Sequence, residues 1–170
     1  NDGIDNSASN CIFKKEFLDN NSILFNKQGI NHGEDLLFMM LCLPKAKRVF
    51  LSADTHFYGY RQNPFSLGNN YDSSYAAHTR VLTAKLLEQA SALTPKEEFY
   101  RVCCTRIINL AFYVLFMEAS PVNKRSFCQK AEYINNFFAD NIIKDALKNA
   151  DFDNTEFGKA LPVKLALKGF

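Results

Sequence analysis

Residues 94–119 read TPKEEFYRVCCTRIINLAFYVLFMEA, and this stretch decides the fold class of the second half of the chain. A helix start is predicted at Thr94, Pro95 and Glu97. Thr94 would be the N-cap, Pro95 would take the first helical position, and the Glu97 side chain would bond back to the N-cap backbone. The helix that follows is apolar on most of its faces, which is explained by burial on several sides. We therefore expect it to be the central helix of a bundle.

Helical periodicity continues on both sides of this stretch. The sequence predicts further helices over residues 76–90, 124–140, 142–150 and 155–167, the last of them despite Pro162. Asp151 to Asn154 is typical of a turn between the last two helices. Residues 71–170 are therefore expected to form a helical C-terminal region.

The first 70 residues mix helical and strand patterns. A short amphipathic helix is expected over residues 12–18, and a second one from Glu34 to a last turn that Pro44 disturbs. Short apolar or aromatic runs at 23–25, 49–51 and 55–61 predict strands. The expected fold class is therefore α+β, mostly helical, with a short β-containing segment at 1–70 followed by the helical bundle.

Composition excludes several classes of protein. The chain has 170 residues and a net charge of +2, so it lacks the strong basic character of a protein that binds nucleic acid by electrostatics. Its five cysteines form no Cys-x-x-Cys pair and are interpreted as reduced core residues of a cytoplasmic protein. The chain begins without Met and without a signal peptide, and we expect it to be a piece of a longer protein.

Four residues carry candidate chemistry. Glu34 and Asp35 could present a carboxylate that accepts a proton, or could serve only as a helix cap. His32 could join them around a divalent metal, or lie in a plain surface loop. Arg61 could hold a phosphate through paired hydrogen bonds, or be a solvated residue at a strand end. No Gly-rich phosphate loop, Gly-x-Ser-x-Gly or His-Glu-x-x-His motif is present.

Four sequence pieces resemble family 2 glycosyltransferases when they are taken in order. They are Cys11-Ile-Phe-Lys-Lys-Glu-Phe-Leu, Gly33-Glu-Asp-Leu-Leu-Phe, Ala46-Lys-Arg-Val-Phe-Leu, and Phe57-Tyr-Gly-Tyr-Arg followed by Pro64-Phe-Ser-Leu. In that family a similar helix precedes a loop ending in Glu-Asp, and a Tyr-x-Tyr-Arg signature follows. The resemblance covers residues 11–67 and lapses in the helical tail.

The resemblance implies a GT-A fold and roles for individual residues. Asp35 would be the general base on the acceptor hydroxyl of an inverting enzyme, and Glu34 would orient the loop or contact the acceptor. Arg61 would reach the donor diphosphate or fix its strand, and His32 is a further candidate for binding donor or acceptor. Residues 1–70 would then be the acceptor-side part of the catalytic domain.

The donor-binding motifs of the family do not occur in this sequence. The resemblance therefore implies that a nucleotide-sugar and a divalent metal, Mn²⁺ or Mg²⁺, are bound by an N-terminal half outside it, and that this fragment alone is inactive. The implied partners are the nucleotide-sugar and a saccharide or lipid-linked acceptor of bacterial surface polysaccharide, and no nucleic acid. The implied location is the cytoplasm, with peripheral association at the inner membrane face left open. The alternative is a non-catalytic helical interaction or scaffold module.

Overall fold

The computed structural model describes residues 7–25, 30, 32–52, 59, 61 and 70–169. These residues form seven α-helices and two short 3₁₀ turns, and none of them lies in a β-strand. The expectation of an α+β fold with a β-containing acceptor-side segment is therefore wrong for the described part of the chain, which is all-α. The helical C-terminal region is confirmed.

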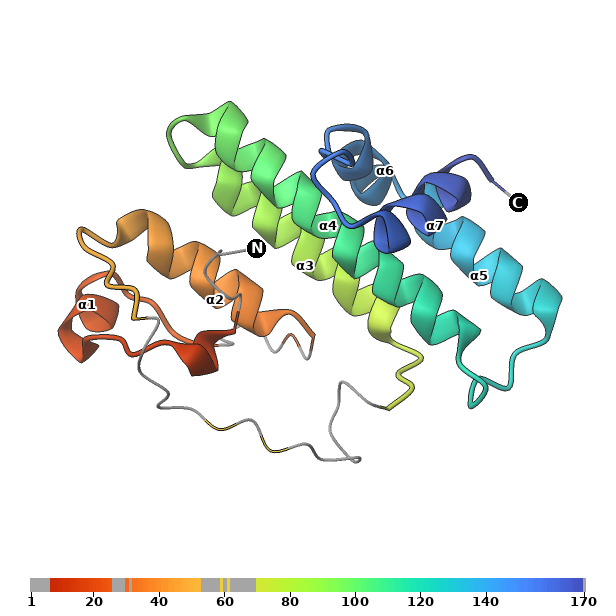
Figure 1. Cartoon of the computed structure of the whole chain (residues 1–170), viewed down its shortest axis with the longest axis horizontal. Helices are drawn as coiled ribbons and strands as arrows, with labels where there is room; N and C mark the ends of the chain where they lie inside the picture. The colour runs from red at the N-terminus through yellow and green to blue at the C-terminus, as the bar shows by residue number, and fades with distance from the viewer. Residues whose placement is uncertain are drawn as a thin grey trace. The chain divides into compact units, whose positions relative to one another are not determined.

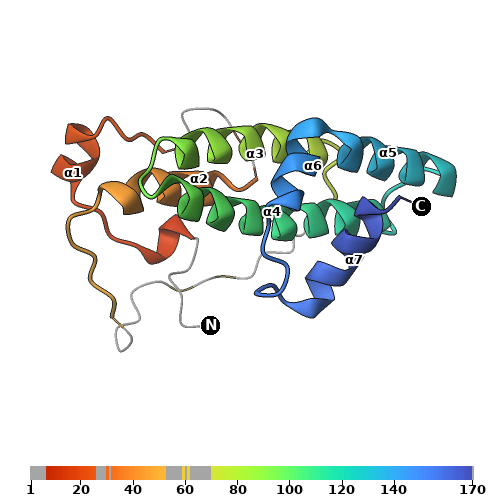
Figure 2. The same cartoon turned by 90° about the horizontal axis from the view of Figure 1, so that it is seen from above.

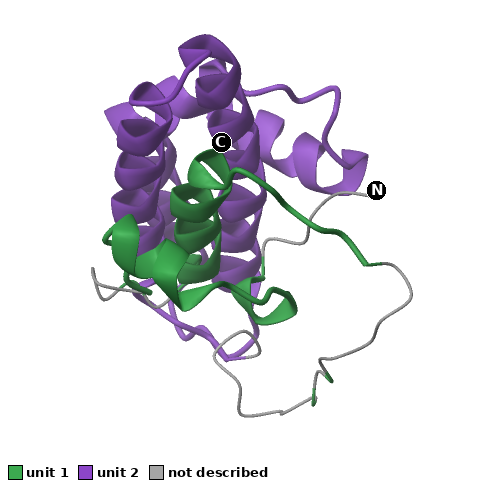
Figure 3. Cartoon of the chain, turned by 90° about the vertical axis from the view of Figure 1, so that its left-hand side faces the viewer, with its two compact units in different colours: residues 1–64 green, residues 65–170 purple. Residues whose placement is uncertain are grey.

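The chain divides into two compact units, residues 1–64 and residues 65–170, which Figure 3 shows in different colours. Each unit has its own helices, and each is described here by itself.

The second unit is a bundle of five helices built around α4 (Figures 1 and 2). Helix α4 contacts each of the other four, and α3 runs beside it for much of its length. The expectation of a central helix is thus confirmed. The five helices are α3 (Tyr75–Ser91), α4 (Lys96–Ala119), α5 (Phe127–Ala139), α6 (Asn141–Lys148) and α7 (Phe157–Leu167).

Helix α4 starts differently from the prediction. Its N-cap is Pro95, in an extended conformation, and no side chain caps the helix, so the role assigned to Thr94 is wrong. The middle of the helix is buried as expected, with Ile107 and Ile108 fully inaccessible to solvent. Its exposed side carries Tyr113 and Phe116, so the apolar character extends beyond the buried faces.

Helix α4 is also long and apolar enough to cross a membrane, the one such helix among the described residues. Half of its most apolar window is buried against the rest of the protein. The central helix of a water-soluble bundle meets the same criteria of length and composition, so this property by itself favours neither environment.

Side chains cap two of the shorter helices. Ser126 and Gln129 form a capping box at the start of α5, in which each side chain bonds the other residue's backbone N–H. Asp140 accepts from the N–H groups of Ile142 and Ile143 at the start of α6. These caps satisfy backbone donors that a helix N-terminus leaves free, and they set the boundary between α5 and α6.

The first unit contains α1 (Lys15–Asn20) and α2 (Glu34–Cys42), with 3₁₀ turns η1 (Ala8–Asn10) and η2 (Leu43–Lys45). Helix α2 ends at Cys42, two residues before Pro44, and a 3₁₀ turn follows it. Because Pro44 has no N–H to donate, it cannot continue the α-helical hydrogen bonds, and the predicted disturbance of the last turn is confirmed. A small core holds the unit together. Its buried members are Ile23, Phe38 and Cys42, and partly buried Ala8, Phe13, Phe17, Leu18 and Leu41 pack against them.

The predicted strand at residues 23–25 is wrong, and Ile23 instead belongs to the motif that terminates α1. Ser22 has a φ of 53°, Ile23 N–H donates to the Leu18 carbonyl at 2.9 Å, and Ser22 N–H donates to the Asp19 carbonyl at 3.1 Å. This pattern is a Schellman motif, which terminates a helix and brings the residue after the left-handed one back against the last turn. Ile23 is apolar because it packs there, in the same core as Leu18.

The predicted strand at residues 49–51 is also wrong. Val49, Phe50 and Leu51 are in irregular backbone and all three are exposed. β-propensity stabilises a strand only when a neighbouring strand completes the hydrogen-bond ladder, and the described residues offer none. The strand expected at 55–61 lies outside the described residues, except for Gly59 and Arg61, which are in irregular backbone.

Candidate functional site

Glu34 and Asp35 are the first two residues of α2. The N-cap position before them belongs to Gly33, whose φ of 81° lies in the left-handed region that glycine adopts without strain. Neither carboxylate therefore occupies the N-cap. They lie in the first turn, where the partial positive charge of the helix N-terminus stabilises anions.

Both carboxylates remain within reach of solvent. Glu34 and Asp35 are half-buried, and Ser7 Oγ donates to Asp35 Oδ2 over 3.4 Å. The long Ser7 bond leaves most of the acceptor capacity of Asp35 for another partner. A carboxylate that is partly exposed and fixed on a helix can take a proton from a hydroxyl placed against it.

The rest of α2 is anchored below this pair. Phe38 packs edge-to-face against Phe13 and Phe25, with ring centroids 5.1 and 5.2 Å apart. Phe38 is also buried, so the helix that carries Asp35 is fixed by the core of the first unit. Anchoring of this kind limits the movement of a side chain that must be placed accurately for chemistry.

Among the described residues, His32 does not form a metal-ligand group with Glu34 and Asp35. His32 is half-buried just before Gly33. Within residues 7–25, 30 and 32–52, no group of three side chains suited to metal binding includes Glu34 or Asp35. Arg61 is exposed, and the tyrosines of its motif lie outside the described residues, so its role stays a prediction.

The buried cysteines are unsuited to nucleophilic chemistry. Burial raises the pKa of Cys42 and of Cys103 to about 11, and that of Cys104 to about 12. A thiol with so high a pKa is almost entirely protonated near neutral pH, and the thiolate is the reactive form. The interpretation of the cysteines as core residues is confirmed for these three; it is wrong for Cys128, which is exposed, and Cys11 is only half-buried.

The second unit contains a buried polar cluster that the sequence did not reveal. Glu118, near the end of α4, is 2% exposed, and its carboxylate accepts from Arg125 Nη1 at 2.6 Å and from Asn123 Nδ2 at 2.8 Å. Arg125 Nη1 also donates to Tyr71 Oη at 2.9 Å, and its guanidinium lies 4.2 Å from the ring centroid of Tyr133. These contacts join α4, the loop before α5, α5 itself and the residues that precede α3.

Electrostatics in this cluster favour the charged guanidinium. Burial lowers the pKa of Arg125, but the hydrogen bond and the charge of Glu118 act in the opposite direction and leave that pKa raised. Burial raises the pKa of both Tyr71 and Tyr133, so their hydroxyls stay protonated. An open hollow of about 420 Å³ lies beside the cluster, lined in part by Tyr71, Arg125 and Gln129. Since Arg125 is already paired, we interpret the cluster as structural.

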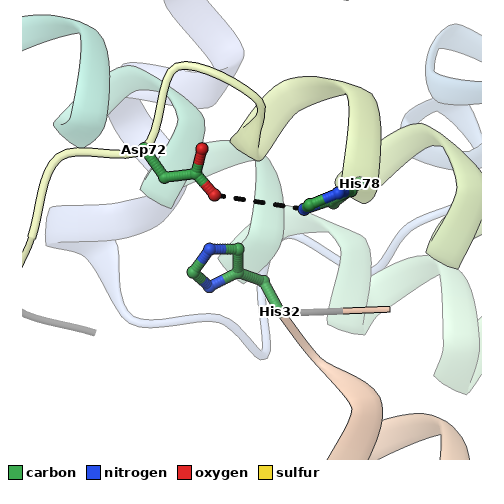
Figure 4. A group of neighbouring side chains, drawn as sticks. All are labelled: His32, Asp72 and His78. Atoms are coloured by element: carbon green, nitrogen blue, oxygen red, sulfur yellow. Dashed lines mark ion pairs between the residues drawn. The ribbon is translucent and has the colours of Figure 1, made fainter. Parts of the chain in front are cut away.

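Asp72 organises the start of α3 in a similar way. Its Oδ1 accepts from Ser74 N at 2.7 Å and from Ser74 Oγ at 2.6 Å, while its Oδ2 lies 4.0 Å from His78 Nδ1 (Figure 4). Each group is about one quarter exposed. The pair links the residues before α3 to its first turn, a role that the sequence analysis did not assign to either residue.

Comparisons with known proteins identify no family for this chain. No family model matches the chain, and neither a curated protein nor a solved structure gives a match. The glycosyltransferase resemblance therefore rests on the motifs of residues 11–67 themselves.

Proposed function

We propose that this chain is the acceptor-side part of an inverting family 2 glycosyltransferase, in which Asp35 is the general base. The observation that carries the proposal is Gly33-Glu34-Asp35, which opens α2 with both carboxylates half-buried in its first turn. Its support from sequence is the order of four motifs over residues 11–67.

The chemistry requires a base in such a position. A sugar hydroxyl is a weak nucleophile, and it attacks the anomeric carbon as the nucleotide diphosphate leaves from the opposite face. A carboxylate within hydrogen-bond reach removes the hydroxyl proton as the new glycosidic bond forms. Asp35 takes that role, and Glu34 orients the loop or contacts the acceptor.

The other partners follow from the same proposal. The donor is a nucleotide-sugar, held with a divalent metal, Mn²⁺ or Mg²⁺, by residues outside this sequence, and Arg61 and His32 contribute to donor or acceptor binding. The acceptor is a saccharide or a lipid-linked saccharide of bacterial surface polysaccharide. The enzyme works in the cytoplasm, in peripheral association with the inner membrane face. Without the donor-binding part, residues 1–170 alone transfer no sugar.

The test compares two carboxylates at the same helical position. Glu16 is the second residue of α1, as Asp35 is of α2, and it is exposed. The full-length protein is incubated with labelled UDP- and GDP-sugars, Mn²⁺ and an extract of lipid-linked saccharides from its own cells. We expect transfer by the parent protein and by Glu16→Gln, and a rate reduced by about 10²–10⁴ in Asp35→Asn. Near-normal transfer by Asp35→Asn would remove Asp35 as the base.

A second candidate is a non-catalytic helical interaction or scaffold module. The observation that favours it is the all-α architecture of the described residues, which form no strand. In this case Glu34 and Asp35 only stabilise the N-terminus of α2. Absence of transfer from every donor by the full-length protein, with its fold intact, would favour the module over the enzyme.

A further inference from the structure

Helix α7 has two apolar faces. One face packs into the bundle through Ala160, Val163 and Ala166, which are buried. The other carries Phe157, Leu161 and Leu165, spaced four residues apart and exposed by 75%, 40% and 54%. Residues at this spacing are neighbours on a helix surface, so the three side chains form one apolar stripe. Burial within the bundle explains the first face and leaves the second face without an explanation.

Lysines share the exposed face with the apolar stripe. At 3.6 residues per turn, five side chains fall within an arc of about 100° around the helix, in the order Lys164, Phe157, Lys168, Leu161 and Leu165. Lys164 and Lys168 are both exposed. The exposed face of α7 therefore alternates positive charge with apolar surface.

Helix α7 itself carries no acidic residue. Residues 157–169 contain no Asp or Glu, and the nearest acids in sequence are Asp151, Asp153 and Glu156. Lys159 pairs with Glu156 at 2.8 Å. Lys164 lies 3.9 Å from the highly exposed Asp153, and it sits 5.1 Å over the ring of Phe152. A long, exposed contact of this kind is weak and can be exchanged for an external anion.

This chemistry fits an anionic lipid surface better than another protein. The centre of a protein interface is depleted of lysine, because burying an unpaired ammonium is costly. At a membrane, lysine side chains extend along the surface and place their ammonium groups among lipid phosphates, while neighbouring apolar side chains enter the acyl boundary. The exposed arc of α7 carries lysines and apolar residues intermixed.

We propose that the exposed face of α7 docks the protein on an anionic membrane, with Phe157, Leu161 and Leu165 in the acyl boundary and Lys164 and Lys168 on lipid phosphates. The proposed function includes peripheral membrane association, and this inference names the surface that makes it. It rests on the proposed function only for the cellular location. The test uses vesicles that contain neither sugar donor nor acceptor. A failure to bind vesicles would therefore leave the transferase proposal intact, and a failure of the transferase proposal would leave the docking proposal intact.

The apolar arm of the test measures co-sedimentation of the full chain with phosphatidylcholine vesicles, with and without one-third phosphatidylglycerol. We expect binding only to the anionic vesicles, and a bound-to-free ratio at least about tenfold lower for Phe157→Ser/Leu161→Ser/Leu165→Ser. The control is Val81→Ser/Phe127→Ser, which alters exposed apolar residues of α3 and α5. Equal loss in the control, or no binding by the parent chain, would overturn the proposal.

The charge arm replaces the lysines. Lys164→Gln/Lys168→Gln should lower binding to the anionic vesicles, while Lys144→Gln/Lys148→Gln, which alters exposed lysines of α6, should leave it unchanged. Raising the salt concentration from about 0.1 to 1 M should weaken binding by the parent chain, because the screening length falls from about 10 to 3 Å. A soluble oligomer that the serine triple variant dissociates, together with no vesicle binding, would assign the face to a protein partner instead.

Discussion

Arg125 Nη1 donates to Glu118 Oε1 at 2.6 Å, which ties the buried end of α4 to the loop before α5. Glu118 is 2% exposed, whereas the side chain of Arg125 is 28% exposed. The pair therefore neutralises a carboxylate that water hardly reaches. Its loss would leave a buried charge with only Asn123 as a partner.

Removal of this guanidinium should destabilise the bundle. We expect Arg125→Met to lower the free energy of unfolding by about 3 kcal/mol, because breaking a buried pair leaves its other charge uncompensated. Tyr71→Phe, which removes only one hydrogen bond to Arg125, should cost about 1 kcal/mol. Urea unfolding followed by circular dichroism measures both values. Equal losses in the two variants would contradict the role given to the ion pair.

Two apolar side chains of α4 should differ in their contribution to stability, because one is buried and the other is exposed. Ile107 is fully buried, so Ile107→Ala should cost about 2–5 kcal/mol of unfolding free energy. Val102 is exposed, and Val102→Ala should change the value by less than about 0.5 kcal/mol. Thermal or urea unfolding provides the comparison. A small loss for Ile107→Ala would show that α4 is not the centre of the core.

Acid should loosen the turn between α6 and α7. Asn154 Nδ2 donates to Asp151 Oδ2 at 2.6 Å, and the side-chain and backbone hydrogen bonds of Asn154 lower the pKa of Asp151. Because the folded pKa is the lower one, the contribution of Asp151 to stability is complete above its unfolded pKa, near about 4. That contribution is lost as the pH falls through the folded pKa.

An NMR titration of the Asp151 carboxyl tests this expectation. Asn154→Ala removes the side-chain donor, so the pKa of Asp151 should rise toward its ordinary value. The backbone hydrogen bond from Asp153, at 3.1 Å, should preserve part of the shift. If the titration curve of Asp151 is the same in both proteins, the Asn154 side chain does not control it.

Thiol reactivity should follow burial. Cys128 is exposed and Cys11 half-buried, whereas Cys42, Cys103 and Cys104 are buried. Burial also raises the pKa of the three buried thiols, so few of them are thiolate at neutral pH. A colorimetric disulfide reagent should give a fast phase in the folded protein that Cys128→Ser reduces. Fast reaction of more than two thiols would indicate that the cores open readily.

The two carboxylates of α2 should differ in the full-length enzyme. Glu34→Gln should reduce transfer less than Asp35→Asn, since Glu34 only orients the loop or contacts the acceptor in the proposed mechanism. Either change removes one charge from the first turn and should cost only about 0.3–1 kcal/mol of stability. Transfer rates and thermal midpoints, measured in parallel, separate the two effects. A larger loss of transfer in Glu34→Gln would pass the role of base to Glu34.

Sequence alone located most of the helices. The helices expected at 76–90 and from residue 96 to 119 correspond to α3 and α4, and the one expected from Glu34 corresponds to α2. Helix formation depends on neighbours three and four residues apart, so its apolar period and its first-turn acids are visible in a local stretch. The position of Asp35 in the first turn of α2 was predictable for the same reason.

Tertiary structure decided what local pattern leaves open. The apolar run at residues 23–25 suits a strand or a helix-terminating contact, and only the packing of Ile23 beside Phe38 selects the second. A strand needs a partner that a local window does not contain, whereas a Schellman motif needs only the preceding turn and an apolar surface. Glu118 likewise resembles a solvated residue in sequence, and it is buried because Arg125 and Asn123 meet it from the following loop.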